Sequence, residues 1–104
     1  MLNKSLKFIV SQKEMPQGIL ITITDIEIMG KKYEEGKKQL DLSNKFYQGE
    51  EKDEKETMEI IKSGYILQFT GLKAVGLGLK LGLIKMGRTV SISGIPHAEV
   101  VVER

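Results

Sequence analysis

The stretch YILQFTGLKAVGLGLKLGL, residues 65–83, decides the fold because it is the densest apolar segment of the chain. Two periodicities compete within it. Every second residue from Leu77 to Leu83 is leucine, which is the spacing of a strand. The series that runs from Leu72 through Val75 to Leu79 instead recurs at helical intervals of three and four. The choice between the two interpretations sets the rest of the topology.

We expect a strand over residues 65–69 followed by a helix. The segment YILQF is rich in aromatic and β-branched side chains, as buried strands are. After it, Thr70 is a candidate N-cap and Gly82 a candidate C-terminal stop. Gly76 and Gly78 each oppose a helix by about 1 kcal/mol. We expect these glycines to let the helix, buried on most sides, lie close against the sheet.

The composition indicates a single domain. With 104 residues, 40% of them hydrophobic, the chain can bury one core but not two of ordinary size. The absence of cysteine excludes disulfide bonds and thiolate metal sites, and it is typical of intracellular proteins. No apolar run is long enough to cross a bilayer, and the charged N-terminus is unlike a signal peptide. We therefore expect a cytoplasmic protein without a membrane partner; the abundance of Lys and Glu is typical of a thermophile.

The N-terminal half is predicted to contain mostly strands and loops. A turn from Met15 to Gly18, with Pro and Gly in turn positions, joins two apolar strands into a hairpin. Asp25 is a candidate cap for one short helical turn. The predicted elements of this half are strands over residues 6–11, 18–24 and 39–42, a charged loop over 31–38 and a second loop over 43–52.

The C-terminal half adds two helices and three strands. Asp53 and Glu56 have the spacing of a capping box, and the acidic first turn suits the helix dipole, which predicts a helix over residues 53–62. Beyond the central stretch, strands are expected over 88–92 and 98–102, around a turn at 93–97. This order predicts an α+β fold with two layers: a mixed or antiparallel sheet of about five to six strands with two helices on one face.

Four segments occur in an order that resembles the archaeal Domain of Unknown Function 424 family. They are GKKYEEG (30–36), FYQGE (46–50), the stretch over 71–84 and SGIPHAE (93–99), and the resemblance covers about residues 18–102. The chain departs from the family pattern where Gln68 replaces Asn, Leu72-Lys73 replaces Glu-Arg and Glu99 replaces Gln. The family has Ala at the position of Gly78, which agrees with a helix. The resemblance implies an archaeal intracellular domain of unassigned function, loosely associated with translation.

One candidate polar site centres on His97, the only histidine and the only side chain that titrates near neutrality without perturbation. It follows a predicted turn containing Gly94 and Pro96, which could present the imidazole in a cleft. Gln68 and Glu99 are the candidate neighbours of a small ligand there. The alternative is structural, because a turn needs Gly and Pro and the imidazole can bond nearby backbone. One histidine does not build a zinc site, so no metal is assigned.

The second candidate site is a set of basic and aromatic side chains in predicted loops. Lysines provide cations for phosphates, and tyrosines provide flat faces for unpaired bases, as RNA recognition requires. The alternative is a solvated loop whose aromatic rings cover the edge of the core. The candidate RNA-binding residues are Lys31, Lys32, Tyr33, Lys37, Lys38, Lys45 and Tyr47.

No catalytic or cofactor signature accompanies these sites. The acidic cluster over residues 50–59 is explained by a helix start, and the glycines after Phe69 lack the spacing of nucleotide-binding loops. We therefore expect a small non-enzymatic module, without a cofactor, that binds RNA or a ribonucleoprotein of the translation machinery. The alternatives are a small-ligand site or enzyme built around His97, and a protein-interaction adaptor that docks through a sheet edge or the acidic helix.

Overall fold

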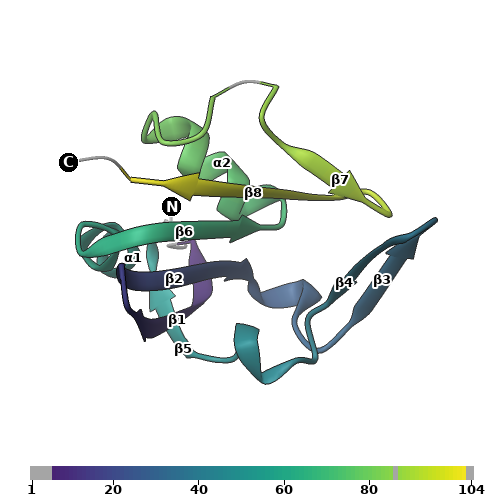
Figure 1. The fold of residues 1–104 in the computed structure, drawn as a ribbon, viewed down its shortest axis with the longest axis horizontal. Helices are drawn as coiled ribbons and strands as arrows, with labels where there is room; N and C mark the ends of the chain where they lie inside the picture. The colour runs from purple at the N-terminus through teal and green to yellow at the C-terminus, as the bar shows by residue number, and fades with distance from the viewer. Residues whose placement is uncertain (1–5, 86, 103–104) are drawn as a thin grey trace, which may run out of the picture.

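A six-stranded mixed sheet forms the centre of the computed structural model, which describes residues 6–85 and 87–102 (Figure 1). The strand order is β5-β1-β2-β6-β8-β7, and the β2–β6 pair is the parallel one. The predicted α+β class is confirmed, and of the predicted mixed or antiparallel sheet of about five to six strands the structure has the mixed form with six strands. The strands of this sheet are β1 (Lys7–Met15), β2 (Gly18–Asp25), β5 (Glu50–Asp53), β6 (Gly64–Thr70), β7 (Val90–Ile92) and β8 (Ile95–Val101).

The β1–β2 hairpin forms around the predicted turn. Met15 pairs with Gly18, so Pro16 and Gln17 make the connection. β1 extends further than predicted because its register with β2 continues without a break as far as this turn. β2 then leaves the hairpin and pairs in parallel with β6, which requires the chain between them to cross over the sheet.

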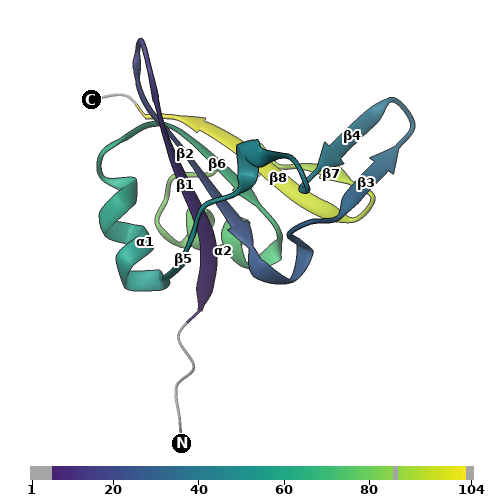
Figure 2. The ribbon, with the colours of Figure 1, turned by 90° about the horizontal axis from the view of Figure 1, so that it is seen from below.

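Both helices cover the same face of the sheet, as predicted (Figure 2). α1 spans Glu54–Ile61 and α2 spans Leu72–Lys80. The main core lies between the helices and the sheet, where Leu67 and Phe69 of β6 are completely buried. Its buried members are Phe8, Val10, Ile21, Ile23, Ile61, Leu67, Phe69, Ala74, Val75, Leu77, Ile84 and Ala98.

α2 confirms the helical interpretation of the central stretch, but it is not buried on most sides. Leu72 is 77% exposed, and Gly76 has open space around it. Gly78 is the glycine that permits close packing, because a Cβ there would lie 2.3 Å from Cδ1 of Ile84 and 3.3 Å from the ring of Phe69. One face of α2 therefore meets the sheet and the opposite face meets solvent.

The start of α2 corrects two predictions. Thr70 is not its N-cap; that position belongs to Gly71, which has no side chain to offer. The carboxylate of Asp25, at the end of β2, accepts hydrogen bonds from the backbone N–H groups of Lys73 (2.9 Å) and Ala74 (2.7 Å). Asp25 thus caps α2 across the fold, and it makes no side-chain cap to the short helical turn that follows it.

The other helix boundaries agree with prediction. At α1, Asp53 accepts from the backbone N–H of Glu56 at 2.7 Å, and the Asp53 N–H donates to Glu56 Oε1 at 3.0 Å, which completes the capping box. α2 ends before Gly82, whose φ of +74° reverses the chain. Among the described residues, no helix has the length and hydropathy to span a membrane.

The charged segment predicted as a loop over residues 31–38 is part of a β-hairpin, so that prediction is wrong. β3 (Lys32–Glu35) and β4 (Lys38–Asp41) form a separate two-stranded sheet, which we call the arm. Tyr33 stands opposite Leu40 in this hairpin. The strand predicted over residues 39–42 corresponds to β4, whereas β3 has Tyr33 as its one apolar side chain and so lacks a visible alternation.

A second, smaller core lies on the side of the sheet opposite the helices, beneath the arm (Figure 2). The chain predicted as a loop over 43–52 contributes η2 (Lys45–Tyr47) and the edge strand β5, and η1 (Ile26–Ile28) precedes the arm. The predicted turn at 93–97 is too long, because only Ser93 and Gly94 separate β7 from β8. The second core consists of Leu40, Leu42 and Ile92, with Ile28, Tyr33, Tyr47 and Ile95 packed against it.

Candidate functional site on the helix-free face

The side of the sheet opposite α1 and α2, which we call the helix-free face, carries polar side chains in register. Successive residues of a strand point to opposite faces. Leu67 and Phe69 of β6 enter the main core, so Gln68 and Thr70 between and after them project to the helix-free face. Strand pairing then aligns these two residues with polar residues on the neighbouring strands.

The first polar row crosses four strands. Ser11 stands opposite Thr22, Thr22 beside Gln68, and Gln68 opposite Glu99. The hydroxyl groups of Ser11 and Thr22 bond to each other, and Gln68 Nε2 donates to Glu99 Oε2 at 2.9 Å. Ser11 and Thr22 are buried whereas Glu99 is exposed, so the row leads from the interior of the sheet to solvent.

The second row contains Thr24, Thr70 and His97, which are aligned by the same strand pairing. Both threonines are fully buried, and Thr70 Oγ1 lies 2.8 Å from His97 Nδ1. Burial lowers the pKa of His97 below its ordinary value of 6.5, and the nearby Glu99 carboxylate opposes this shift. The imidazole is therefore neutral at pH 7, with Nδ1 occupied by Thr70.

Two buried oxygen atoms in these rows have no hydrogen-bond partner among the described residues: Thr24 Oγ1 and Gln68 Oε1. The ionised Glu99 carboxylate only accepts, so the Gln68 amide must turn Nε2 towards it and Oε1 away. A buried polar atom left unpaired costs about 1–3 kcal/mol. Native proteins keep few such atoms, so two in adjacent rows mark this face as a candidate binding site.

The arm and η2 border the helix-free face. The backbone N–H of Ser93, in the β7–β8 turn, donates to Glu35 Oε1 of the arm at 2.7 Å. Ser11 Oγ donates to the Phe46 carbonyl of η2 at 3.5 Å, and Lys13 Nζ lies 5.6 Å from the centre of the Phe46 ring. The lysine-bearing segments and the strand that carries His97 thus meet on one side of the molecule.

The lysines that border this face are mostly free of ion pairs within the described ranges. Lys32 is the exception, 3.9 Å from Glu34. Elsewhere in the described fold, Lys55, Lys85 and Arg88 have no ion pair, but five lysines have carboxylate partners: Lys7, Lys52, Lys62, Lys73 and Lys80. Around the helix-free face the unpaired cations are Lys13, Lys31, Lys37, Lys38 and Lys45.

The two predicted stacking residues are less available than the lysines. Tyr33 and Tyr47 are half-buried and pack against the second core. Burial, with a smaller contribution from Asp41, raises the pKa of Tyr47 above its ordinary value of 10.0. The structure favours the structural interpretation for both rings, because most of their apolar area already has protein neighbours.

The residues predicted around His97 divide between two places. Gln68 and Glu99 share the helix-free face with the imidazole. Gly94 and Pro96 instead line a small cavity of about 170 Å³ at the start of α2, beside Asp25. Pro96 directly precedes His97 in β8, so its ring projects to the opposite face of the strand. These two residues are therefore not part of the polar rows.

Sequence reasoning missed the hydroxyl groups that supply half of the polar rows. Thr22 and Thr24 alternate with Ile21 and Ile23 in the segment ITIT, and this pattern predicts one apolar and one polar face for β2. Their alignment with Gln68 depends on the parallel β2–β6 register, which no local pattern encodes. In the part of the chain that the structure describes, no three His, Cys, Asp or Glu side chains gather as metal ligands.

An apolar groove of about 410 Å³ opens beside the polar rows. Ile9, which stands opposite Thr24, forms part of its floor, and Met29 and Leu42 contribute apolar walls. Gln48 and Gly49 close the side next to β5. The helix-free face therefore combines an apolar groove, half-exposed polar groups and a border of lysines.

The fold has a known counterpart. An uncharacterized conserved protein from Methanopyrus kandleri, solved by crystallography, superimposes with a TM-score of 0.76 at 15% sequence identity, over 94% of this chain and 95% of that one. At this identity the likeness shows the fold alone. Comparison with curated proteins finds no match. A model described as "Protein of unknown function (DUF424)" matches residues 13–102, nearly the whole chain, and the protein therefore belongs to the DUF424 family.

Proposed function

We propose that this chain is a small non-enzymatic module that binds single-stranded RNA, alone or within a ribonucleoprotein of the translation machinery, across its helix-free face. The observation that carries the proposal is the distribution of unpaired lysines. Among the described residues, five of the lysines elsewhere in the fold have carboxylate partners, whereas five of the six that border this face have none. Unpaired cations attract a polyanion without first breaking an ion pair.

Each part of the face has a role in this proposal. Lys37 and Lys38 at the tip of the arm, with Lys13 and Lys45 near η2, contact phosphates. Gln68 and His97 offer hydrogen-bonding groups at the height of base edges, and the apolar groove beside Ile9 accepts a flat base. Single-stranded RNA fits best because its unstacked bases can enter such a surface, whereas a duplex hides them.

Charge reversal on the arm provides the test. We would titrate Lys37→Glu/Lys38→Glu with a fluorescent single-stranded RNA of about twelve nucleotides. The matched control is Lys55→Glu/Lys62→Glu on the helical side. Each pair of changes lowers the net charge by four, from +2 to −2, so the two proteins differ only in where the charge is placed. We expect the arm variant to bind about tenfold more weakly than the control variant.

Salt dependence gives a second measurement of the same interaction. With about five phosphate contacts, log Kd should rise with log salt concentration with a slope of about 3.5. The arm variant, which loses two of these contacts, should show a slope smaller by about 1.4. Equal losses in both variants would mean that net charge and not the helix-free face attracts RNA, and salt-independent binding would remove the proposal altogether.

A second candidate is a small polar ligand held at His97, and the unpaired oxygens of Thr24 and Gln68 favour it. Such a ligand would need a hydrogen-bond donor for each oxygen. Thr24→Val distinguishes the two functions, because it removes one of the proposed ligand contacts but neither a phosphate contact nor a proposed base contact. Retention of the salt-dependent RNA affinity in this variant supports RNA binding through the lysines.

A further inference from the structure

The outer edge of β8 is only partly covered. β8 spans Ile95–Val101, and its pairing with β7 ends at His97. From Ala98 onwards, no strand among the described residues pairs with the side of β8 that faces away from β6. Uncovered edges of this kind are templates for a further strand, unless the protein blocks them.

The backbone of β8 directs its free groups to this edge at two positions. The Gly71 N–H donates to the Pro96 carbonyl at 2.9 Å, and the Val102 N–H donates to the Tyr65 carbonyl at 2.8 Å. Even-numbered residues of β8 therefore bond to β6. Because antiparallel ladders alternate, the N–H and C=O groups of Glu99 and Val101 point to the open edge.

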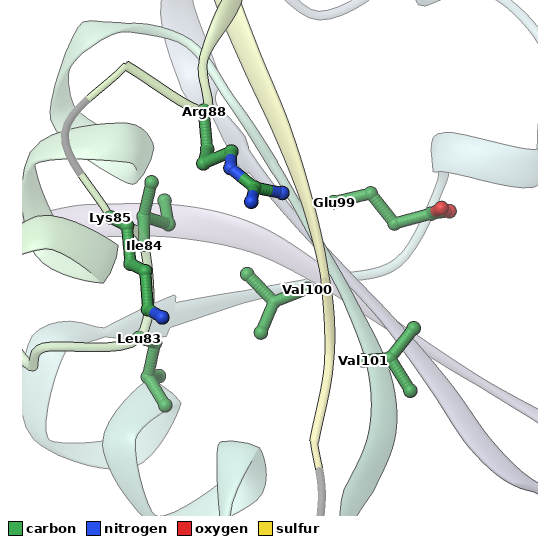
Figure 3. Close-up of a pocket in the computed structure, with 7 residues that line it drawn as sticks. All are labelled: Leu83, Ile84, Lys85, Arg88, Glu99, Val100 and Val101. Atoms are coloured by element: carbon green, nitrogen blue, oxygen red, sulfur yellow. The ribbon is translucent and has the colours of Figure 1, made fainter.

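A groove runs between this edge and the loop that follows α2 (Figure 3). Its volume is about 320 Å³, and the loop contributes Leu83, Ile84, Lys85 and Arg88 to one wall. In the close-up, Val100 points from β8 towards this loop, and Arg88 extends from the loop towards the strand, while Glu99 and Val101 point to the other side of β8.

The loop wall is held in place by α2. The backbone N–H groups of Leu83 and Ile84 both donate to the Gly78 carbonyl, at 2.9 Å and 3.1 Å. The Ile84 side chain is buried against Gly78, which has no Cβ to push it away. The part of the wall formed by Leu83 and Ile84 is therefore attached directly to α2.

The charge of the groove specifies the chemistry of its occupant. Lys85 and Arg88 are exposed and have no ion pair within the described ranges. The carboxylate on the strand side, Glu99, is already bonded to Gln68. Val101 is 52% exposed and adds an apolar contact beside the free backbone groups. The surface thus offers two cations, apolar side chains and strand-spaced hydrogen bonds.

We propose that an extended, acidic segment of a partner protein adds to the edge of β8 as a seventh strand. Its backbone bonds to the N–H and C=O groups of Glu99 and Val101, and its acidic side chains reach Lys85 and Arg88. Strand addition of this kind takes affinity from main-chain hydrogen bonds and specificity from alternate side chains. This site is separate from the arm and does not depend on RNA binding.

The test uses the full chain, labelled with ¹⁵N, and two synthetic peptides. One alternates Glu with Val, and the other alternates Lys with Val. We expect the acidic peptide to shift the amide resonances of Glu99 and Val101 and to slow their hydrogen exchange. The basic peptide should leave both unchanged, because Lys85 and Arg88 repel it. Equal effects of the two peptides, or none at these amides, would overturn the proposal.

Two variants locate the contact. Val101→Pro removes an N–H that the β6 ladder does not use, so the edge tolerates it while strand addition fails. Val101→Ala is the matched control and should bind the acidic peptide like the natural chain. Lys85→Glu/Arg88→Glu keeps every backbone group and should weaken binding by about tenfold. If Val101→Pro does not fold, the peptide affinity of Lys85→Glu/Arg88→Glu tests the proposal instead.

Discussion

The two faces of the sheet are built from the same strands but differ in what they bury. The helical face places Phe69, Leu67 and Ala98 in a closely packed apolar core. The helix-free face places their neighbours Gln68 and His97, with Thr70, in partly satisfied polar rows. Apolar burial supplies stability, whereas buried polar groups left without partners reduce it. The comparison indicates that the first face maintains the fold and the second is available for binding.

The largest expected effect is the difference in unfolding free energy between substitutions at two consecutive residues of β6. Phe69→Ala should lower the free energy of unfolding by about 3–5 kcal/mol, because the ring is completely buried against α2. Gln68→Ala, on the opposite face, should change it by no more than about 1 kcal/mol, because removal of the unpaired Oε1 offsets loss of the bond to Glu99. Urea denaturation of both variants provides the measurement. Similar losses would mean that the two faces contribute equally to stability.

Asp25 connects the end of β2 to the helical face, and its removal should have the next largest effect. Asp25→Ala leaves two backbone N–H groups at the start of α2 without their acceptor, which should cost about 2 kcal/mol. Glu27→Ala is the control, since it removes an exposed ion pair with Lys73 and should cost less than about 1 kcal/mol. If the two variants melt at the same temperature, the cap contributes no more than a surface charge.

The unpaired hydroxyl of Thr24 should produce a change of the opposite sign. Thr24→Val keeps the shape of the side chain and removes a buried oxygen that has no partner, so it should stabilise the fold by about 1 kcal/mol. Thr57→Val is the matched control, because the equally buried Thr57 donates to the Asp53 carbonyl at 2.7 Å. That variant should lose about 1 kcal/mol. Destabilisation by both would show that the Thr24 hydroxyl is satisfied.

The smallest expected effect is a dependence of stability on pH. The folded-state pKa of His97 lies below 6.5, so the unfolded chain binds a proton that the folded chain excludes as the pH falls through this value. The His97 contribution to the unfolding free energy is therefore complete above pH 6.5 and decreases towards the lower, folded-state pKa. Denaturation of the natural chain and of His97→Gln between about pH 7.5 and 5.5 would measure the difference.

Asp25 acts on the pH dependence in the other direction, and its contribution cancels from the comparison because the natural chain and His97→Gln both contain it. Burial raises its pKa above 3.8 despite two backbone hydrogen bonds. The folded chain then binds the proton before the unfolded chain does, so its contribution increases as the pH falls through the folded-state pKa. We expect the natural chain to lose more stability than His97→Gln when the pH is lowered from about 7.5 to 5.5. Equal losses in the two proteins would contradict the predicted role of His97.

Local patterns predicted the elements whose signals lie within a few residues. The capping box fixed the start of α1, the turn before Gly18 fixed the first hairpin, and Gly82 fixed the end of α2. The strand predicted over residues 39–42 agrees with β4 of the arm. β3 and β5 were missed because charged side chains on short, exposed strands conceal the alternation.

The candidate site was less predictable, since it depends on contacts between distant segments. His97 was identified from its uniqueness, but its bond to Thr70 follows from the pairing of β6 with β8. The lysines were identified from the sequence, and packing of the arm on the second core, together with its bond to Ser93, brings the arm lysines to the same side as the imidazole. Register and crossover are properties of the assembled sheet, which single-segment periodicity does not contain.

The cap at the start of α2 has a consequence for how the protein folds. Asp25 precedes the amides that it binds by 48 and 49 positions, so the N-terminal cap of this helix forms only when the first hairpin is in place. With glycines at 76 and 78, the isolated segment would rarely become helical on its own. Its amide protons should therefore exchange with solvent only when the whole domain unfolds. The second helix and the first hairpin then form one cooperative unit.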